Sequence, residues 1–131
     1  MKKLKGIVVM LLLSLTFFGL TSCNSEAVSE YQQITPEEAK KIMDTEKEYV
    51  IIDARTEEEF AEGHIEGAIL IPEYEIAHRA QKELPDKNAL ILVYCRSGRR
   101  SKIASSELVK LGYKNVKEFG GILDWPYEIV K

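Results

Sequence analysis

Cys95 is the residue of this chain whose surroundings most clearly favour chemistry. It follows the apolar run ALILVY (89–94) and precedes RSGRRS (96–101), which carries three arginines. Cationic side chains and the positive end of a helix both favour thiolate over thiol, and the thiolate is the nucleophilic form of cysteine. The sequence therefore predicts a reactive, ionised Cys95. The alternative is a small buried hydrophobic residue, as free cysteines often are.

The residues after Cys95 have the composition of an anion-binding loop. A strand over 89–94 is expected to end at Cys95, and the carboxyl ends of strands in open α/β sheets are where ligands bind. Gly98 permits a tight turn before a helix expected over 101–111, so that backbone N–H groups and the helix N-terminus face a bound anion. We expect this loop to consist of Arg96, Ser97, Gly98, Arg99 and Arg100.

Apolar runs of strand length alternate with helical segments along the chain. The runs at 49–52, 68–71 and 89–94 are typical of strands buried on both faces of a parallel sheet. A last strand is expected at 116–119. This alternation predicts an α/β fold class, with a central, mostly parallel sheet flanked by helices.

Helix signals lie between these runs. The sequences TPEE (35–38) and TEEE (56–59) both have the pattern of a capping box, in which a threonine and the glutamate three residues later cap a helix N-terminus. Gly63 is expected to end the second of these helices. Two further helices are expected over 73–84 and 101–111.

Residues 1–22 have the layout of a bacterial export signal, because three lysines precede an apolar run over 7–20. That run is short for a transmembrane span, which needs about 20 apolar residues. The sequence LTSC (20–23) then resembles the lipobox of bacterial lipoproteins. The resemblance implies cleavage before Cys23, lipidation of Cys23 and an exported, membrane-anchored protein in the periplasm or at the cell surface. An uncleaved membrane anchor is the alternative.

Residues 23–30 are polar and lack periodicity, which is typical of a tether before a single domain over 31–131. A lipidated Cys23 has no sulfur left for a disulfide, so Cys95 remains as a free thiol. Removal of residues 1–22 with their three lysines takes the net charge from −3 to −6. A chain this acidic argues against a nucleic-acid partner. We expect a monomer.

Four motifs, in order along the chain, resemble the single-domain branch of the rhodanese family. They are Asp53-Ala54-Arg55, the segment from Glu59 to Pro72, Cys95 to Ser101, and Gly120-Gly121-Ile122 with Trp125. Rhodanese cysteines take sulfur from thiosulfate or another sulfane donor as a persulfide and pass it to cyanide or a thiol. The resemblance implies a sulfurtransferase of the thiosulfate type with a small anionic donor, a thiol or cyanide acceptor, and no metal or other cofactor.

The resemblance also implies roles for the residues around Cys95. The backbone N–H groups of Arg96 to Arg100 would cradle the persulfide, and the side chains of Arg96 and Arg99 would attract an anionic donor. Arg100 is expected to pack inward and brace the loop. Ser101 is expected to give structural support.

Other polar residues near these motifs are given structural roles. Asp53 and Arg55 fit a partly buried ion pair beside the loop better than a catalytic pair. Histidine side chains can act as general bases, but His64 matches a structural position of the family, so we expect it to bond to the backbone. The glutamates of 57–62 are expected to be a solvated helix start and not a metal site. Trp125 is expected in the core or a pocket wall.

Two other kinds of function remain open from the sequence. Phosphatases and arsenate reductases related to rhodaneses also hold an anion with a cysteine and an arginine. However, the phosphatase relatives have a longer loop than Cys95 to Arg100, and arsenate reduction needs a second thiol. The other alternative is a persulfide carrier or interaction module without turnover. An intact Cys95 argues against an inert domain but does not separate a carrier from an enzyme.

Overall fold

The structure is a computed structural model that describes residues 30–131. The predicted export signal over 1–22, the lipidation site Cys23 and all but the last residue of the tether lie outside this range. Within 30–131, no helix has both the length and the apolar character needed to cross a membrane.

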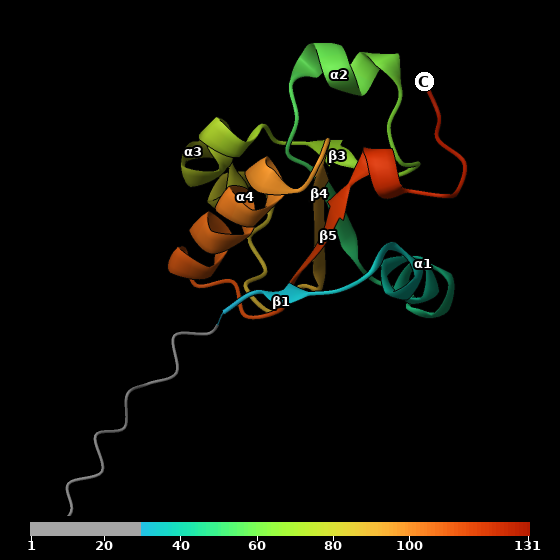
Figure 1. The fold of residues 1–131 in the computed structure, drawn as a ribbon. Helices are drawn as coiled ribbons and strands as arrows, with labels where there is room; N and C mark the ends of the chain where they lie inside the picture. The colour runs from blue at the N-terminus through green and yellow to red at the C-terminus, as the bar shows by residue number, and fades with distance from the viewer. Residues whose placement is uncertain (1–29) are drawn as a thin grey trace, which may run out of the picture.

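A five-stranded sheet forms the centre of the domain (Figure 1). In spatial order its strands are β1 (Gln32–Gln33), β5 (Val116–Gly121), β4 (Ile91–Cys95), β2 (Val50–Asp53) and β3 (Ile69–Leu70). Every neighbouring pair is parallel, so all strands point their carboxyl ends at one edge of the sheet. The predicted α/β fold with a mostly parallel sheet is confirmed, and the sheet is parallel throughout.

Helices cover both faces of this sheet. They are α1 (Pro36–Thr45), α2 (Glu57–Glu62), α3 (Ile76–Glu83) and α4 (Arg99–Lys110), with 3-10 turns η1 (Glu73–Glu75) and η2 (Ile122–Asp124). Figure 1 shows α3 and α4 on one face of the sheet and α1 on the other, while α2 lies beyond the carboxyl ends of the strands. Cys95 is the last residue of β4, so it lies at the same edge of the sheet as α2.

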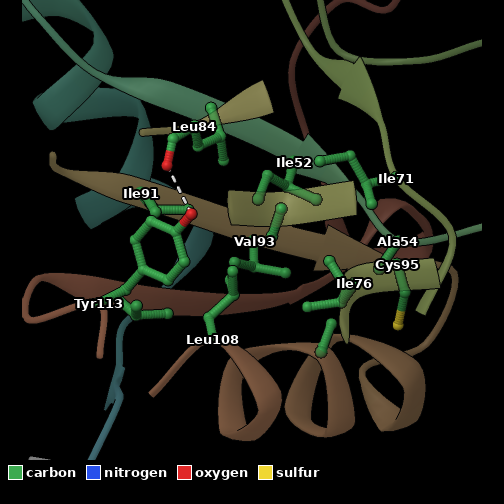
Figure 2. Close-up of a cluster of buried hydrophobic side chains, with 13 residues drawn as sticks. Ile52, Ala54, Ile71, Ile76, Leu84, Ile91, Val93, Cys95, Leu108 and Tyr113 are labelled. Carbon is green, nitrogen blue, oxygen red and sulfur yellow. Dashed lines mark hydrogen bonds between the residues drawn. The ribbon is translucent and has the colours of Figure 1, made fainter. Parts of the chain in front are cut away.

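Two apolar layers hold the sheet between its helices. The layer beneath α3 and α4 contains Val93, Cys95 and Leu108 (Figure 2). The layer on the α1 side contains Leu92 and Tyr94. Successive side chains of a strand point to opposite faces, so β4 places Cys95 on the α4 side and Tyr94 on the α1 side.

The two predicted capping boxes differ in outcome. At Thr35 the box is complete, because the threonine and Glu38 cap each other. At Thr56 the hydroxyl accepts from the Glu59 N–H, which is half of the box. The Glu59 carboxylate forms an ion pair with Arg100 instead of capping the Thr56 N–H. The prediction of a full second box is therefore wrong.

Four other elements also differ from the predictions. The sequence does not predict β1, because residues 32–33 are exposed glutamines that become a strand only by pairing with β5. The run at 68–71 forms a short edge strand in which Ile69 is 36% exposed, so the expectation of burial on both faces is wrong. Helix α4 begins earlier than predicted, at Arg99, and β5 extends to Gly121.

Candidate active site

Cys95 ends β4, the strand that lies between β2 and β5 in the sheet. Its thiol is directed toward α4 (Figure 2), and the residue is 1% exposed. Cys95 pairs with Gly121 of β5 after an irregularity in the β4–β5 register. A Cβ atom on Gly121 would lie only 2.0 Å from the carbonyl oxygen of Arg96. A glycine at 121 therefore lets β5 approach the loop that follows Cys95.

The loop after Cys95 turns sharply into α4. Gly98 has a φ of 106°, in the left-handed region that favours glycine. Its N–H donates to Cys95 Sγ at 3.0 Å. On the other side of the loop, the carbonyl oxygen of Arg96 accepts from the Leu123 N–H at 3.2 Å. The turn thus directs the Gly98 N–H at the sulfur. A hydrogen bond from η2 stabilises the opposite side of the loop.

A second set of contacts lies beneath the thiol. The Cys95 S–H donates to Ser101 Oγ at 3.3 Å. Ser101 is fully buried, and its hydroxyl lies 2.6 Å from Glu118 Oε1. Glu118 is itself 3% exposed and accepts from the Gly120 N–H at 2.8 Å. Sequence reasoning missed Glu118, because a single glutamate in a strand run gives no signal of what it will face.

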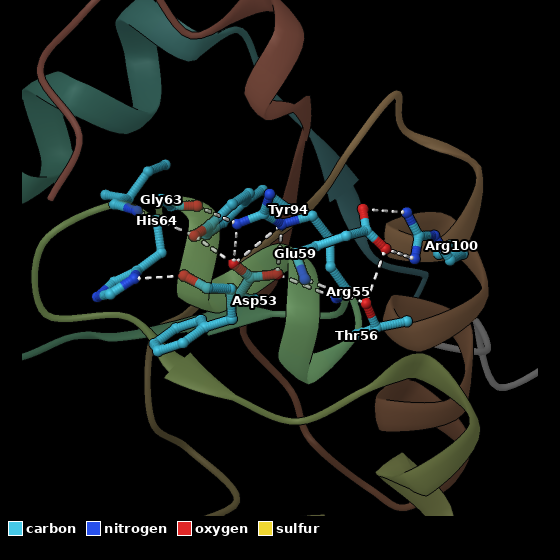
Figure 3. A network of polar contacts seen from close by, with 10 residues as sticks. Asp53, Arg55, Thr56, Glu59, Gly63, His64, Tyr94 and Arg100 are labelled. Atoms are coloured by element: carbon cyan, nitrogen blue, oxygen red, sulfur yellow. Dashed lines mark hydrogen bonds and ion pairs between the residues drawn. The ribbon is translucent and has the colours of Figure 1, made fainter. Parts of the chain in front are cut away.

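The three arginines that follow Cys95, one in the loop and two at the start of α4, have different surroundings. Arg100 forms two hydrogen bonds with the Glu59 carboxylate, at 2.6 and 2.9 Å (Figure 3). Arg96 and Arg99 are exposed. Arg100 thus joins α4 to α2, which is consistent with a bracing role, whereas Arg96 and Arg99 are accessible to an anion.

Glu59 corrects the prediction that the glutamates of 57–62 are a solvated helix start. Its side chain is only 24% exposed, and that of Arg100 is 22% exposed. The hydrogen bonds from Arg100 lower the pKa of Glu59 to about 2. The same bonds raise the pKa of Arg100 above its ordinary value. Glu59 is therefore ionised, and its partner is Arg100, which follows the loop after Cys95.

Asp53 and Arg55 form a more deeply buried network (Figure 3). Asp53 Oδ2 accepts from Arg55 Nη2 at 2.7 Å and from the Tyr94 hydroxyl at 2.6 Å. Arg55 Nη2 also donates to the carbonyl oxygen of Gly63 at 2.6 Å, and the Tyr94 hydroxyl accepts from the Ile65 N–H at 3.0 Å. The predicted ion pair is present, and it is buried rather than partly buried.

The carboxylate of Asp53 stabilises the protonated forms of Arg55 and Tyr94. Burial by itself lowers the pKa of Arg55, but the hydrogen bond and charge of Asp53 raise it above the ordinary value. Burial, followed by the charge of Asp53, raises the pKa of Tyr94 well above its usual range. Tyr94 therefore remains a hydrogen-bond donor to Asp53 at all moderate pH values. No sequence motif pointed to Tyr94, which lies in a plain apolar run.

A hollow of about 310 Å³ opens beside the loop. Its lining consists of Arg55, Glu59, Glu62, Gly63, Arg96, Ile122, Leu123 and Ile129. Larger hollows lie elsewhere on the domain, but this one includes Arg96, the residue next to Cys95. A small anion held there would lie against the loop that carries the thiol.

His64 and Trp125 have structural contacts. His64 Nδ1 lies 2.9 Å from the carbonyl oxygen of Phe60, and the two rings stack with centroids 3.7 Å apart. The predicted bond of His64 to the backbone is confirmed. Trp125 is 9% exposed and packs against Phe119, as predicted for a core residue.

Known proteins resemble this chain in sequence and in structure. The family model described as Rhodanese-like domain matches residues 35–127. Thiosulfate sulfurtransferase PspE of Escherichia coli (strain K12) is 41% identical over 73 residues, which are 56% of this chain and 70% of that protein. A sulfurtransferase of Allochromatium vinosum is 38% identical over 88 residues, which are 66% of this chain and 79% of that protein. The solved structure described as "rhodanese with anions from E. coli" is 38% identical, has a TM-score of 0.60, and matches 63% of this chain and 98% of its own.

Proposed function

The chain belongs to the rhodanese-like family, and from that membership we propose that it is a sulfurtransferase whose Cys95 carries sulfur as a persulfide. The observation that carries the proposal is the position of Cys95, at the carboxyl end of β4 with the Gly98 N–H donating to its sulfur. Relatives that are themselves named sulfurtransferases support the reaction class.

The proposed reaction has two steps at one sulfur atom. The Cys95 thiolate attacks the outer sulfur of the donor, a new S–S bond forms, and with thiosulfate the leaving group is sulfite, which takes the electron pair of the broken S–S bond. A thiol or cyanide then attacks the outer sulfur of the persulfide and regenerates the thiolate. The Gly98 N–H and the N-terminus of α4 stabilise the negative charge that the sulfur carries in both states.

A small anionic donor such as thiosulfate fits the charges around the loop. Arg55 and Arg100 are engaged by carboxylates, at Asp53 and Glu59 respectively. Arg96 and Arg99 are exposed, and neither has an ion-pair partner in the described part of the chain. These two side chains are therefore the ones we assign to attracting the donor.

Membrane tethering through Cys23 is part of the same proposal and is supported by the lipobox-like sequence at 20–23. Replacing Cys23 with Ala should abolish incorporation of radiolabelled lipid into the protein, because the thiol is the acceptor. Cys95→Ala is the matched control and should incorporate lipid normally. Unchanged incorporation in the Cys23→Ala protein would contradict the anchor.

The reaction class is tested by measuring two activities on the same protein. Thiocyanate formation from thiosulfate and cyanide should be readily detected, and Cys95→Ser should abolish it while leaving the circular dichroism spectrum unchanged. Hydrolysis of a phosphate ester should be absent. Hydrolysis that depends on Cys95, without thiocyanate formation, would replace the proposal with a phosphatase. Sulfur loading without turnover would indicate a carrier.

A further inference from the structure

Glu118 is a buried carboxylate near the thiol loop, and the proposed sulfur transfer gives it no role. Asp53 and Glu59 each have an arginine partner. Glu118 is 3% exposed and, within residues 30–131, has no cationic partner. Burying a carboxylate without a cation is costly, and a proton on the group removes that cost. Among residues 30–131, the charge of Glu118 is stabilised by hydrogen bonds alone, from the Ser101 hydroxyl and the Gly120 N–H.

Ser101 connects Glu118 to Cys95. Its Oγ lies 2.6 Å from Glu118 Oε1, 3.0 Å from the carbonyl oxygen of Gly98 and 3.3 Å from that of Gly120. A hydroxyl has one proton to donate, and the short bond to the carboxylate is the strongest of the three. The Ser101 oxygen is then left to accept from the Cys95 S–H, at 3.3 Å.

From this line of hydrogen bonds we propose that Cys95 and Glu118 share one proton through Ser101. The thiol S–H bond breaks as Ser101 Oγ takes that proton, and the original Ser101 O–H bond breaks as Glu118 Oε1 takes the other. Ser101 stays neutral and the negative charge moves from Glu118 to the sulfur. In the product state, Ser101 and the Gly98 N–H both donate to the thiolate. Glu118 is a positioning residue, because it acts on the sulfur only through Ser101.

The charges around the two ends favour this direction of transfer. At the sulfur end, Arg100 of α4 is held by Glu59 of α2, and its pKa is raised by Glu59 first and by Cys95 to a smaller extent. Arg96 extends from the loop itself, and Arg99 is the first residue of α4. On the β2 side, Asp53 is neutralised by its own arginine.

At the Glu118 end the cross-strand partners are uncharged, and the adjacent Lys117 donates to the side chain of Gln32. Glu118 pairs with Gln33 of β1 and with Val93 of β4 across the sheet. Ser101 and Ser105 are the buried polar residues of α4. Positive charge is thus concentrated at the thiol end, which favours the anion on sulfur and the proton on Glu118.

The test measures the rate of Cys95 alkylation by iodoacetamide against pH. Two groups that share a proton titrate as a pair, so the wild-type rate should rise in two steps with a plateau between them. Glu118→Gln keeps the shape but takes no proton, and its rate should rise in one step. Glu107→Gln, on the outer part of α4, is the matched control and should retain both steps. A wild-type profile with one step that Glu118→Gln leaves unchanged would overturn the proposal.

A second measurement uses the wild-type protein alone, in case Glu118→Gln does not fold. Infrared difference spectra are recorded before and after alkylation of Cys95 at the plateau pH. Between the two steps, the proton on Glu118 is held there by the negative charge on the nearby sulfur. Alkylation removes that charge, so Glu118 should release its proton and the C=O band of a carboxylic acid should disappear. If no such band is lost, the shared proton is excluded. The inference rests on the proposed sulfur transfer and names the group that accepts the proton when the Cys95 thiol becomes a thiolate. Both measurements use alkylation and no sulfur donor, so the two proposals can fail separately.

Discussion

The two arginine–carboxylate pairs beside the thiol loop differ in burial and in what they connect. Asp53 and Arg55 are two residues apart in sequence, and their side chains are 0% and 6% exposed. Glu59 and Arg100 are 41 residues apart, and their side chains are 24% and 22% exposed. The first pair connects the end of β2 to Gly63 and to Tyr94 of β4, whereas the second joins two helices.

This difference indicates how much each pair contributes to stability. A buried pair that loses one partner leaves an unpaired charge out of water, which is strongly destabilising. A pair in contact with water has a weaker Coulomb attraction, and water and salt replace much of what is lost. We therefore expect the Asp53 pair to be needed for folding and the Glu59 pair to act mainly on the position of the loop.

The largest effect is expected for Asp53→Ala. It leaves the Arg55 guanidinium without its carboxylate and removes the acceptor of the Tyr94 hydroxyl. Removing one partner of a buried pair costs about 3–5 kcal/mol, measured as the free energy of unfolding in urea at neutral pH. Glu75→Ala, which breaks a half-exposed pair between η1 and α3, is the control. An Asp53→Ala protein of wild-type stability but without activity would instead make Asp53 part of the reaction.

A smaller effect is expected for Arg100→Ala. Loss of a pair that is partly in contact with water costs roughly 1 kcal/mol or less, so the free energy of unfolding should change little. A double-mutant cycle with Glu59→Gln isolates the interaction between the two side chains. If its coupling energy equals or exceeds that of the Asp53–Arg55 cycle, the comparison between the two pairs is wrong.

The smallest effect is a pH dependence that comes from Glu59. Its pKa is lowered from 4.5 to about 2 in the folded protein by Arg100. The stability from this pair is therefore complete above pH 4.5 and is lost as the pH falls toward 2. The difference in free energy of unfolding between wild type and Glu59→Gln should shrink across that window. A difference that stays constant from pH 5 to pH 2 would contradict the ion pair.

The parts of the site that follow from the sequence are those with local signals. The loop after Cys95 was predicted because an apolar run, a glycine and three arginines lie together in the chain. The ion pair of Asp53 and Arg55 was predicted because the two residues lie in one short motif. Local patterns of this kind also predicted the alternation of strands and helices.

The parts that the sequence did not predict depend on which elements lie side by side. Glu59 meets Arg100 because α2 and the N-terminal end of α4 both lie at the carboxyl edge of the sheet. Ser101 meets Glu118 because β5 is the neighbour of β4. No local pattern states the order of strands in a sheet, so neither contact was visible before the fold was known.

The central claim, that Cys95 carries sulfur, is tested most directly by the mass of the peptide that contains it. After incubation of the protein with thiosulfate, that peptide should gain the mass of one sulfur atom. Cyanide should then remove the sulfur and release thiocyanate, and Cys95→Ser should show neither change. An unmodified Cys95 peptide after incubation with both thiosulfate and polysulfide would contradict the account.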